Sequence, residues 1–264
     1  MESELKQRAT IVKNLIKEFL LWLLTPLNKR LGFVKSGNAN SKDNLLDNFW
    51  TTLVKIGFKP LHIVDVGANH GTWTRVALKY FPKANFTLLE PQARMRESIT
   101  DLLERNRKIS FNAVGAGSIS GTFKFTIVER DDSCSFIYTE EDALALGYEQ
   151  IDVPIVTLNE FLSVADLPFP DIIKIDAEGL DIEVLKGAST FFGRTEIFIV
   201  EAGVVNKSIK NSFLDIIKFM DDKEYRLFEI TDINRPLRTQ VLWLVELVFV
   251  KKNGFIDAKS FISS

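Results

Sequence analysis

The chain has almost none of the residues from which proteins build disulfides and transition-metal sites. Cys134 is its single cysteine, and His62 and His70 are its only histidines. One thiol excludes an intrachain disulfide and a zinc site made of cysteines, and two histidines exclude a cluster of several histidines. The scarcity of cysteine favours a reducing compartment, which we expect to be the cytoplasm. Any metal ion would have to be a hard cation with oxygen ligands.

The charge balance and the hydropathy exclude two further classes of protein. The formal net charge is −2 and the pI is about 5.9, so the chain lacks the basic field that non-specific nucleic-acid binding requires. No apolar run reaches the roughly 20 residues of a membrane-spanning helix. With 46% hydrophobic residues, the chain can still bury the core of one large domain.

An amphipathic stretch precedes the main body of the chain. Between Ile11 and Leu24 apolar residues recur at helical spacing, and the polar sequence SGNANSKD (36–43) follows as a linker. We therefore predict an N-terminal helix and linker over residues 1–40 and one domain over residues 41–264. The helix would pack on its own domain, form a homodimer contact, or lie on a membrane surface as a peripheral anchor.

The main body alternates short β-branched runs with helical stretches. Continuous apolar strands with helical crossovers indicate a parallel sheet covered on both faces. Two segments break the alternation: a hairpin-like insertion at about 121–162, and two long strands at 225–232 and 241–252 that should pair antiparallel. The other strands are predicted at 61–67, 84–90, 108–115, 170–178 and 195–203, with helices at 44–56, 72–81, 93–106, 180–190 and 209–222.

The sequence IVDVGANHGTWT (63–74) has the pattern of a strand, a glycine turn and a helix start. Such a turn brings backbone N–H groups close to a ligand at a helix N-terminus. The G-x-G-x-x-G spacing of dinucleotide-binding loops is absent, because Gly67 and Gly71 are four residues apart. Asp65 would repel a pyrophosphate but attract an ammonium group, which favours a cofactor with an amino-acid head such as S-adenosylmethionine. Glu90, at the end of the next strand, could accept hydrogen bonds from both ribose hydroxyls.

The sequence IKIDAEGLDIEVLKG (173–187) places four acids within eight positions, directly after an apolar run. Asp181 and Glu183 open the next predicted helix, where acids complement the helix dipole. Asp176 and Glu178 lie instead at the mouth of a buried strand and would project on one face if the strand stays extended. We therefore expect these two acids to be functional.

The pairing of DVGANHGTWT with KIDAEGLDIEVLKGA, followed by FIVEAG, resembles the FkbM family of S-adenosylmethionine-dependent methyltransferases. The similarity runs from about Asn48 to Lys252, and its most selective part is the D-x-E-G-x-[DE]-x-x-V-L-x-G run. The resemblance implies an α/β, Rossmann-like class I methyltransferase fold, with a mostly parallel sheet, helices on both faces and a C-terminal antiparallel hairpin. It also implies O-methylation of a hydroxyl on a sugar, glycan, lipid or secondary metabolite, without choosing among these acceptors.

The resemblance and the chemistry together define the candidate site. An unactivated alcohol must lose its proton as the new bond forms, and the candidates for the base are Asp176 and Glu178, with Glu201 behind them. Asp176 could instead hold the amino group of the cofactor or Mg²⁺, although few oxygen ligands for a metal are evident. His62 is expected to be structural. The candidate cofactor-binding residues are Asp65, Val66, Gly67, Ala68, Asn69, Gly71, Thr72, Glu90, Pro91, Asn112, Ala113 and Asp176.

Two alternatives remain open. An NAD-linked oxidoreductase is disfavoured by the missing third glycine and by the terminal hairpin, where a dehydrogenase would continue with another parallel unit. A catalytically silent methyltransferase fold could serve as a scaffold, but the acids retained at the strand ends argue against it. Binding of S-adenosylmethionine, its demethylated product and NAD would separate the three.

Overall fold

The computed structural model describes residues 42–128, 134, 136, 138–205, 213–235 and 240–260. The fold belongs to one compact unit, Leu45–Ser264. The helix and linker predicted over residues 1–40 lie outside the described residues, so their membrane or dimer contact stays a prediction. In the part of the chain that the structure describes, no helix combines the length and the apolarity needed to cross a bilayer.

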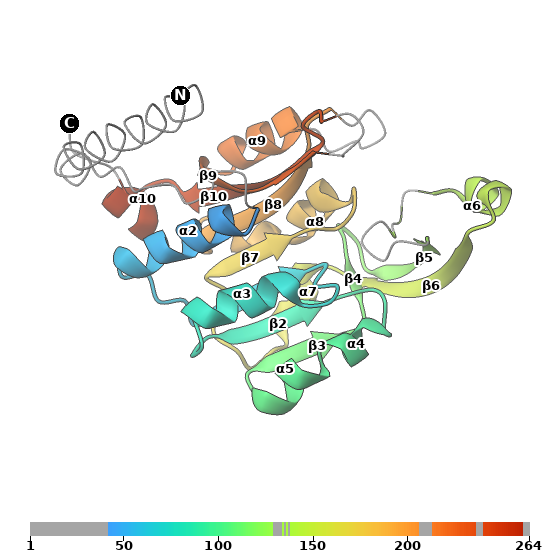
Figure 1. Cartoon of the computed structure of the whole chain (residues 1–264), viewed down its shortest axis with the longest axis horizontal. Coiled ribbons are helices and arrows are strands. Elements are labelled where there is room, and N and C mark those ends of the chain that lie inside the picture. Colours follow the sequence, from blue (N-terminus) through green and yellow to red (C-terminus); the bar gives the residue numbers. More distant parts are fainter. Residues whose placement is uncertain are drawn as a thin grey trace, which may run out of the picture. The chain divides into compact units, whose positions relative to one another are not determined.

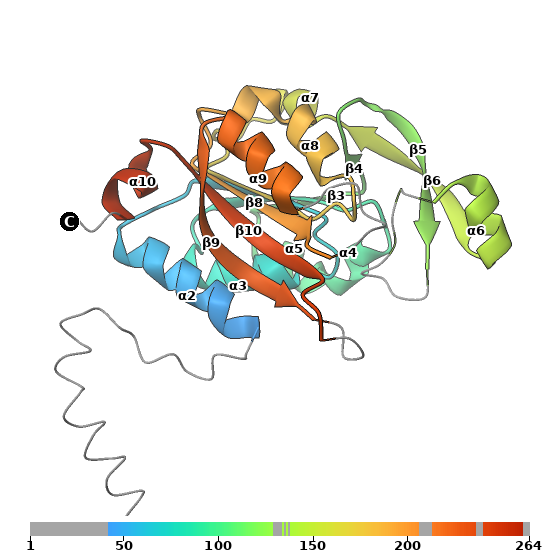
Figure 2. The same ribbon diagram turned by 90° about the horizontal axis from the view of Figure 1, so that it is seen from above.

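A seven-stranded sheet with the order β3-β2-β1-β7-β8-β10-β9 forms the centre of the unit (Figures 1 and 2). The neighbours from β3 to β8 pair in parallel, while β10 runs antiparallel to both β8 and β9. This arrangement confirms the predicted class I methyltransferase fold with its C-terminal antiparallel hairpin. The strands are β1 (His62–Val66), β2 (Asn85–Leu89), β3 (Ile109–Asn112), β7 (Ile172–Ile175), β8 (Ile197–Gly203), β9 (Tyr225–Asn234) and β10 (Leu244–Lys251).

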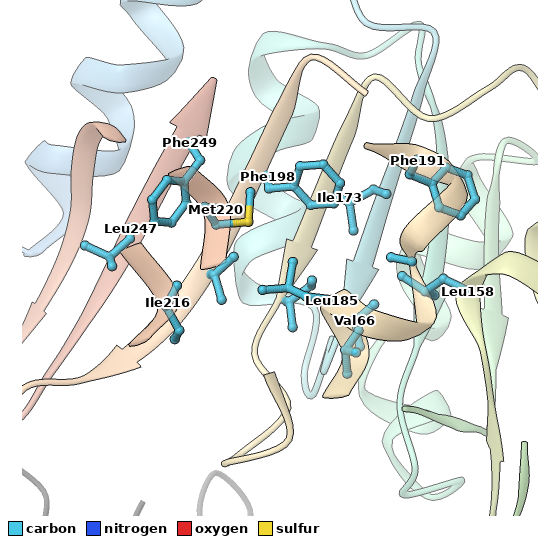
Figure 3. Packing of buried hydrophobic residues seen from close by; sticks show 14 of the residues in the cluster. Val66, Leu158, Ile173, Leu185, Phe191, Phe198, Ile216, Met220, Leu247 and Phe249 are labelled. Atoms are coloured by element: carbon cyan, nitrogen blue, oxygen red, sulfur yellow. The ribbon is translucent and has the colours of Figure 1, made fainter. Parts of the chain in front are cut away.

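Helices cover both faces of the sheet because side chains on successive strand residues point to opposite faces. In β1, Ile63 packs with one group of helices and Val64 and Val66 pack with the other. Figure 3 shows the second group, where Leu185, Ile216 and Met220 meet the sheet. The first group is α2 (Lys42–Lys55), α3 (Thr72–Tyr80), α5 (Thr100–Arg105) and α10 (Phe255–Ser260), and the second is α7 (Leu158–Ser163), α8 (Asp181–Gly187) and α9 (Phe213–Asp222).

The insertion forms a second, three-stranded sheet with the order β4-β6-β5. The antiparallel pairing of β5 (Gly121–Ile127) with β6 (Glu149–Val156) confirms the predicted hairpin. The connection between them contains α6 (Glu140–Leu146), which was not predicted. Its N-terminus carries a cap, because the Thr139 hydroxyl accepts a hydrogen bond from the Asp142 N–H at 3.1 Å.

Two predicted elements are interrupted. The strand predicted at 108–115 splits into β3 and β4 (Gly115–Ala116), because β4 leaves the large sheet and pairs with β6. The helix predicted at 93–106 splits into α4 (Met95–Ser98) and α5 at Ile99, whose φ of −114° is not helical. Both interruptions leave the order of strands and crossovers unchanged.

His62, the first residue of β1, is buried and engages both ring nitrogens. Nδ1 lies 2.7 Å from the carbonyl oxygen of Pro168, and Nε2 lies 2.9 Å from the hydroxyl of Thr87. Because a carbonyl only accepts, Nδ1 carries the proton and Nε2 accepts from Thr87 in the neutral ring. Burial lowers the pKa of His62, although the hydrogen bond to Pro168 and the charge of Asp171 act in the opposite direction. These contacts agree with the structural role expected for His62.

We expect His62 to make the protein less stable in acid. The unfolded chain binds the histidine proton near pH 6.5, whereas the folded chain binds it only at lower pH. The free energy of unfolding should therefore fall as the pH drops below this value, and level off below the folded pKa. His62→Gln should flatten this dependence, to which one group contributes at most about 1.4 kcal/mol per pH unit.

Urea denaturation at a series of pH values measures this effect. His70→Gln, which removes the other histidine at an exposed position, is the matched control. A His62→Gln protein whose stability keeps the wild-type pH dependence would contradict the prediction.

Candidate active site

The predicted site residues all lie at the carboxyl ends of neighbouring parallel strands. β1 pairs with β2 on one side and with β7 on the other. The chain therefore adds strands on one side of β1 up to β3 and on the other side from β7 onward. A ligand crevice opens at such a switch point in an α/β sheet. Asp65 and Val66 end β1, Glu90 and Pro91 follow β2, Asn112 ends β3 and Ala113 follows it, Asp176 and Glu178 follow β7, and Glu201 lies near the end of β8.

The loop after β1 is a tight turn held by backbone hydrogen bonds, two of which reach the end of β2. The N–H groups of Gly67 and Ala68 both donate to the carbonyl oxygen of Leu89, at 2.9 and 3.2 Å. The Gly71 N–H donates to Ala68 O at 2.7 Å, and α3 begins at the next residue, Thr72, which is exposed. The predicted glycine turn at a helix N-terminus is therefore present.

Gly67 lies directly against the chain at the end of β7. Its φ is +74°, and a Cβ atom built there would overlap the carbonyl oxygen of Asp176. Asp176 in turn donates its backbone N–H to Val66 O at 3.1 Å. The cofactor loop and the acidic motif are thus joined through their backbones, although the two segments are more than a hundred residues apart.

Glu90 is fixed beneath the same loop. One carboxylate oxygen accepts the N–H of Asn69 and the other accepts the N–H of Gln92, both at 2.9 Å. Burial raises the pKa of Glu90, while these two backbone hydrogen bonds act to lower it. Since each carboxylate oxygen offers two lone pairs, Glu90 keeps acceptor capacity for ribose hydroxyls. Cofactor contact by Glu90 stays a prediction.

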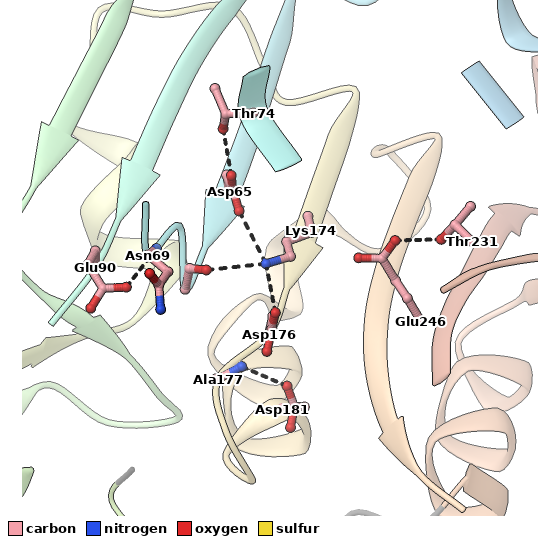
Figure 4. A network of polar contacts seen from close by, with 11 residues as sticks. Asp65, Asn69, Thr74, Glu90, Lys174, Asp176, Ala177, Asp181, Thr231 and Glu246 are labelled. Carbon is pink, nitrogen blue, oxygen red and sulfur yellow. Dashed lines mark hydrogen bonds and ion pairs between the residues drawn. The ribbon is translucent and has the colours of Figure 1, made fainter. Parts of the chain in front are cut away.

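Asp65 is fully buried and already has partners inside the protein. The hydroxyl of Thr74 donates to its Oδ2 at 2.6 Å, and the Lys174 ammonium lies 3.5 Å from its Oδ1 (Figure 4). The carboxylate therefore lies below the crevice, between the sheet and α3. Its predicted contact with the amino group of a cofactor stays a prediction.

Lys174 is the residue that the sequence analysis missed. Its Nζ lies 3.1 Å from Asp176 Oδ2, 3.2 Å from the carbonyl oxygen of Gly67 and 3.5 Å from Asp65 Oδ1 (Figure 4). Burial acts to lower the pKa of Lys174, but the negative charges of Asp176, Asp65 and Glu246 outweigh it and raise the pKa. The available signal was one lysine within the buried strand IIKI, because a charge in such a strand needs partners.

The acidic motif turns sharply after β7, so the extended strand expected through Glu178 is wrong. β7 ends at Ile175, and Glu178 has a φ of +47° in the turn before α8. Asp181 holds this turn, because its carboxylate accepts the N–H groups of Ala177 and Gly179 at 2.9 and 3.3 Å. Burial, assisted by the charge of Asp176, raises the pKa of Asp181 to about 6. Asp181 is structural, as predicted, but from a buried position.

Three half-buried carboxylates meet at the crevice. Asp176, Glu178 and Glu201 each place an oxygen within 4.8 Å of the others. Burial and the charges of its acidic neighbours, Asp176 foremost, raise the pKa of Glu201 well above its ordinary value. The turn thus brings together the three acids predicted as catalytic.

Glu246 on β10 extends this acidic group and was also missed. It lies opposite Glu201 in the strand pairing, and the Thr231 hydroxyl donates to it. Burial raises the pKa of Glu246 to about 7. Hard cations favour such carboxylate oxygens, but the Lys174 ammonium already occupies one oxygen of Asp176.

The remaining predicted residues lie near the same ends of the strands. Val66 and Ala68 are buried, and Asn112 donates its side-chain N–H to Leu88 O at 3.1 Å. Pro91 is half-buried and Ala113 is exposed at the same edge of the sheet. Their contacts with a cofactor stay predictions.

A curated protein matches part of this chain in sequence. A curated relative, the hexuronic acid methyltransferase AglP of Haloferax volcanii, is 26% identical over 174 residues, which make up 65% of this chain and 65% of that protein. The match therefore spans a little less than two thirds of the relative's length.

Two solved structures show a similar arrangement. The precorrin-6y C5,15-methyltransferase of Geobacter metallireducens has a TM-score of 0.45 and 13% identity, covering 83% of this chain and 94% of that chain. The 1,6-didemethyltoxoflavin-N1-methyltransferase of Burkholderia thailandensis has a TM-score of 0.45 and 10% identity, covering 89% of both chains. TM-scores below 0.5 add nothing beyond the fold that the strand order establishes.

The family is shown by the sequence match. The family model described as the methyltransferase FkbM domain covers residues 65–227, which is more than half of the chain and includes the glycine loop and the acidic motif. The chain therefore belongs to the methyltransferase FkbM domain family.

Proposed function

We propose that this protein is a methyltransferase that transfers the methyl group of S-adenosylmethionine to a hydroxyl oxygen of a sugar or a sugar-bearing acceptor. The observation that carries the proposal is the meeting of Asp176, Glu178 and Glu201 beside the glycine loop of β1. An alcohol acceptor needs a base at the point of methyl transfer, and these acids provide one. The hexuronic acid methyltransferase relative supports a sugar as the acceptor class.

The residues divide the reaction between positioning and proton removal. Bound S-adenosylmethionine would supply an electrophilic methyl carbon on its sulfonium sulfur. The turn at Gly67–Gly71 and Glu90 hold the cofactor, and positioning of the two reactants lowers the barrier. Asp176 takes the hydroxyl proton as the O–C bond forms and the C–S bond breaks. Its Oδ2 is held by Lys174, which leaves Oδ1 for the acceptor.

Glu178 is the second candidate for the base, because it lies in the same acidic group and is half-buried. Glu201, whose pKa is raised by burial and by its acidic neighbours, lies behind the two other acids. A Mg²⁺ ion is not part of the proposal, since methyl transfer from a sulfonium needs no Lewis acid. The acids nevertheless offer the oxygen ligands that a hard cation prefers.

Calorimetry with S-adenosylmethionine, S-adenosylhomocysteine and NAD tests the cofactor. We expect both sulfur ligands to bind and NAD to show no binding, with the same affinities in EDTA and in excess Mg²⁺. Binding of neither sulfur ligand at millimolar concentration would overturn the proposal, and binding of NAD alone would favour the oxidoreductase.

The acceptor is tested by incubating the protein with S-adenosylmethionine and with hexuronic acids or hexuronic-acid glycosides. A mass increase of one methyl group, stable to mild base, would identify an ether on a hydroxyl rather than an ester on the carboxylate. Cofactor binding with no methylated product across sugar, lipid and metabolite acceptors would favour the catalytically silent scaffold.

A further inference from the structure

Lys174 occupies the centre of the site without facing the crevice. It lies on β7, its side chain is 4% exposed, and its partners come from three places in the chain. Asp65 on β1 is its direct partner in the strand pairing, Gly67 begins the cofactor loop, and Asp176 follows β7. The ammonium group donates hydrogen bonds to Gly67 O and Asp176 Oδ2, and it forms an ion pair with Asp65 Oδ1 without a hydrogen bond between them.

The charges around Lys174 do not balance. Asp65 and Asp176 form ion pairs with the ammonium, and Glu246 acts on it through its charge. Four charged side chains project from the face of the sheet that packs against α2 and α3: Asp65, Lys174, Glu201 and Glu246. On each of the four strands, the charged residue lies two positions from a hydrophobic residue that is buried on this face. Among the described residues, the positive charge of Lys174 therefore lies beside acids contributed by several strands.

We infer that Lys174 is the positioning residue that joins the cofactor loop to the catalytic acid and sets the charge of the crevice. The inference rests on the proposed function. From beneath the site, Nζ fixes the Gly67 carbonyl and turns Oδ2 of Asp176 inward, so that Oδ1 faces the acceptor. Its positive charge also limits how strongly the crevice favours the sulfonium cofactor over its neutral product. The release of S-adenosylhomocysteine then depends on the net charge of the crevice.

Two variants separate these roles. Lys174→Met keeps the length and apolar volume of the side chain but leaves Asp65 and Asp176 uncompensated. The double variant Lys174→Met with Asp65→Asn removes one charge of each sign, and the amide oxygen introduced on β1 can still accept the Thr74 hydroxyl. Lys186→Met is the matched control, because this lysine of the same motif is exposed and pairs only across one helical turn with Glu183.

Circular dichroism, thermal unfolding, and calorimetry with S-adenosylmethionine and S-adenosylhomocysteine are measured for each protein. Lys174→Met should raise the preference for S-adenosylmethionine over S-adenosylhomocysteine about 10-fold, because an unbalanced negative charge attracts the sulfonium at close range. The double variant should fold, return this preference to the wild-type value, and bind both ligands at least about 10-fold more weakly, since the Gly67 carbonyl loses its donor. Lys186→Met should match the wild type.

The outcomes distinguish the inference from the function on which it rests. If the wild type binds neither ligand, the proposed function fails and Lys174 loses its role with it. If the wild type binds both and the Lys174 variants have unchanged affinities and preference, only the inference is overturned. A double variant that does not fold, or that weakens both ligands without any shift of preference in Lys174→Met, would assign Lys174 to the fold alone.

Discussion

Asp176→Asn is expected to lower methyl transfer by at least about 10²-fold, the size of a typical general-base contribution. An amide keeps the shape of the side chain and can still accept the hydrogen bond that Lys174 donates at 3.1 Å. It cannot take a proton from an alcohol at neutral pH. The variant should therefore fold and bind S-adenosylhomocysteine, while its turnover falls with any hexuronic acid or glycoside that the wild type methylates.

Glu178→Gln is the companion change, because Glu178 offers its carboxylate to the same point. The two variants are compared in turnover, provided that both bind the cofactor equally well. The residue whose replacement lowers turnover more is the base. Asp152→Asn, which removes an exposed carboxylate paired with Lys124 on the insertion, is the control for loss of one negative charge. If Asp176→Asn and Glu178→Gln both retain wild-type turnover, the catalytic assignment is wrong even though the fold is right.

The parts of the site that could be predicted are those that follow the strand ends. Asp65, Glu90, Asp176 and Glu201 each stand at or next to the end of an apolar run. Parallel strands place their carboxyl ends on one edge of a sheet, so local patterns were enough to gather these residues. The parallel strands with helical crossovers and the terminal hairpin followed from the same local patterns.

The parts that could not be predicted depend on strand pairing. Lys174 meets Asp65 because β1 and β7 are neighbours in one register, and Glu246 faces Glu201 only through the antiparallel pairing of β10 with β8. A shift of one residue in either register would turn these side chains to the other face. No local sequence pattern predicts the register of one strand against another.

The turn after β7 shows a different limit. Gly179 signals a turn, but the turn already includes Glu178, a residue type that seldom adopts a positive φ. The conformation is held by the buried Asp181 carboxylate, which accepts two backbone N–H groups. Asp181 was expected to complement the dipole of the next helix. These two hydrogen bonds within the turn overrode the backbone preference of Glu178 and brought Glu178 to Asp176.

Gly67→Ala is the second change with a large expected effect, and Gly147→Ala is its matched control. The two glycines share a left-handed backbone, with φ of +74° and +72°. A Cβ at Gly147 would meet open space, whereas one at Gly67 would overlap the carbonyl oxygen of Asp176. Alanine at position 147 should cost about 1 kcal/mol of unfolding free energy for its backbone conformation alone. Alanine at position 67 should cost about 3 kcal/mol or more, because overpacking adds to the same strain.

Urea denaturation measures the free energy of unfolding of both variants. Because the backbone strain is common to the two, the difference between their losses reports the steric overlap between Gly67 and Asp176 alone. The Asp176 carbonyl is main chain, so it can yield only by moving the start of the acidic turn or the cofactor loop. Either movement displaces the Gly67 carbonyl from Lys174 Nζ, now 3.2 Å away. Gly67→Ala should therefore also lose S-adenosylhomocysteine affinity, while Gly147→Ala keeps it. Equal losses of stability in the two variants would show that the loop and the acidic motif move independently. That result would contradict the claim that their contact positions the cofactor and the base together.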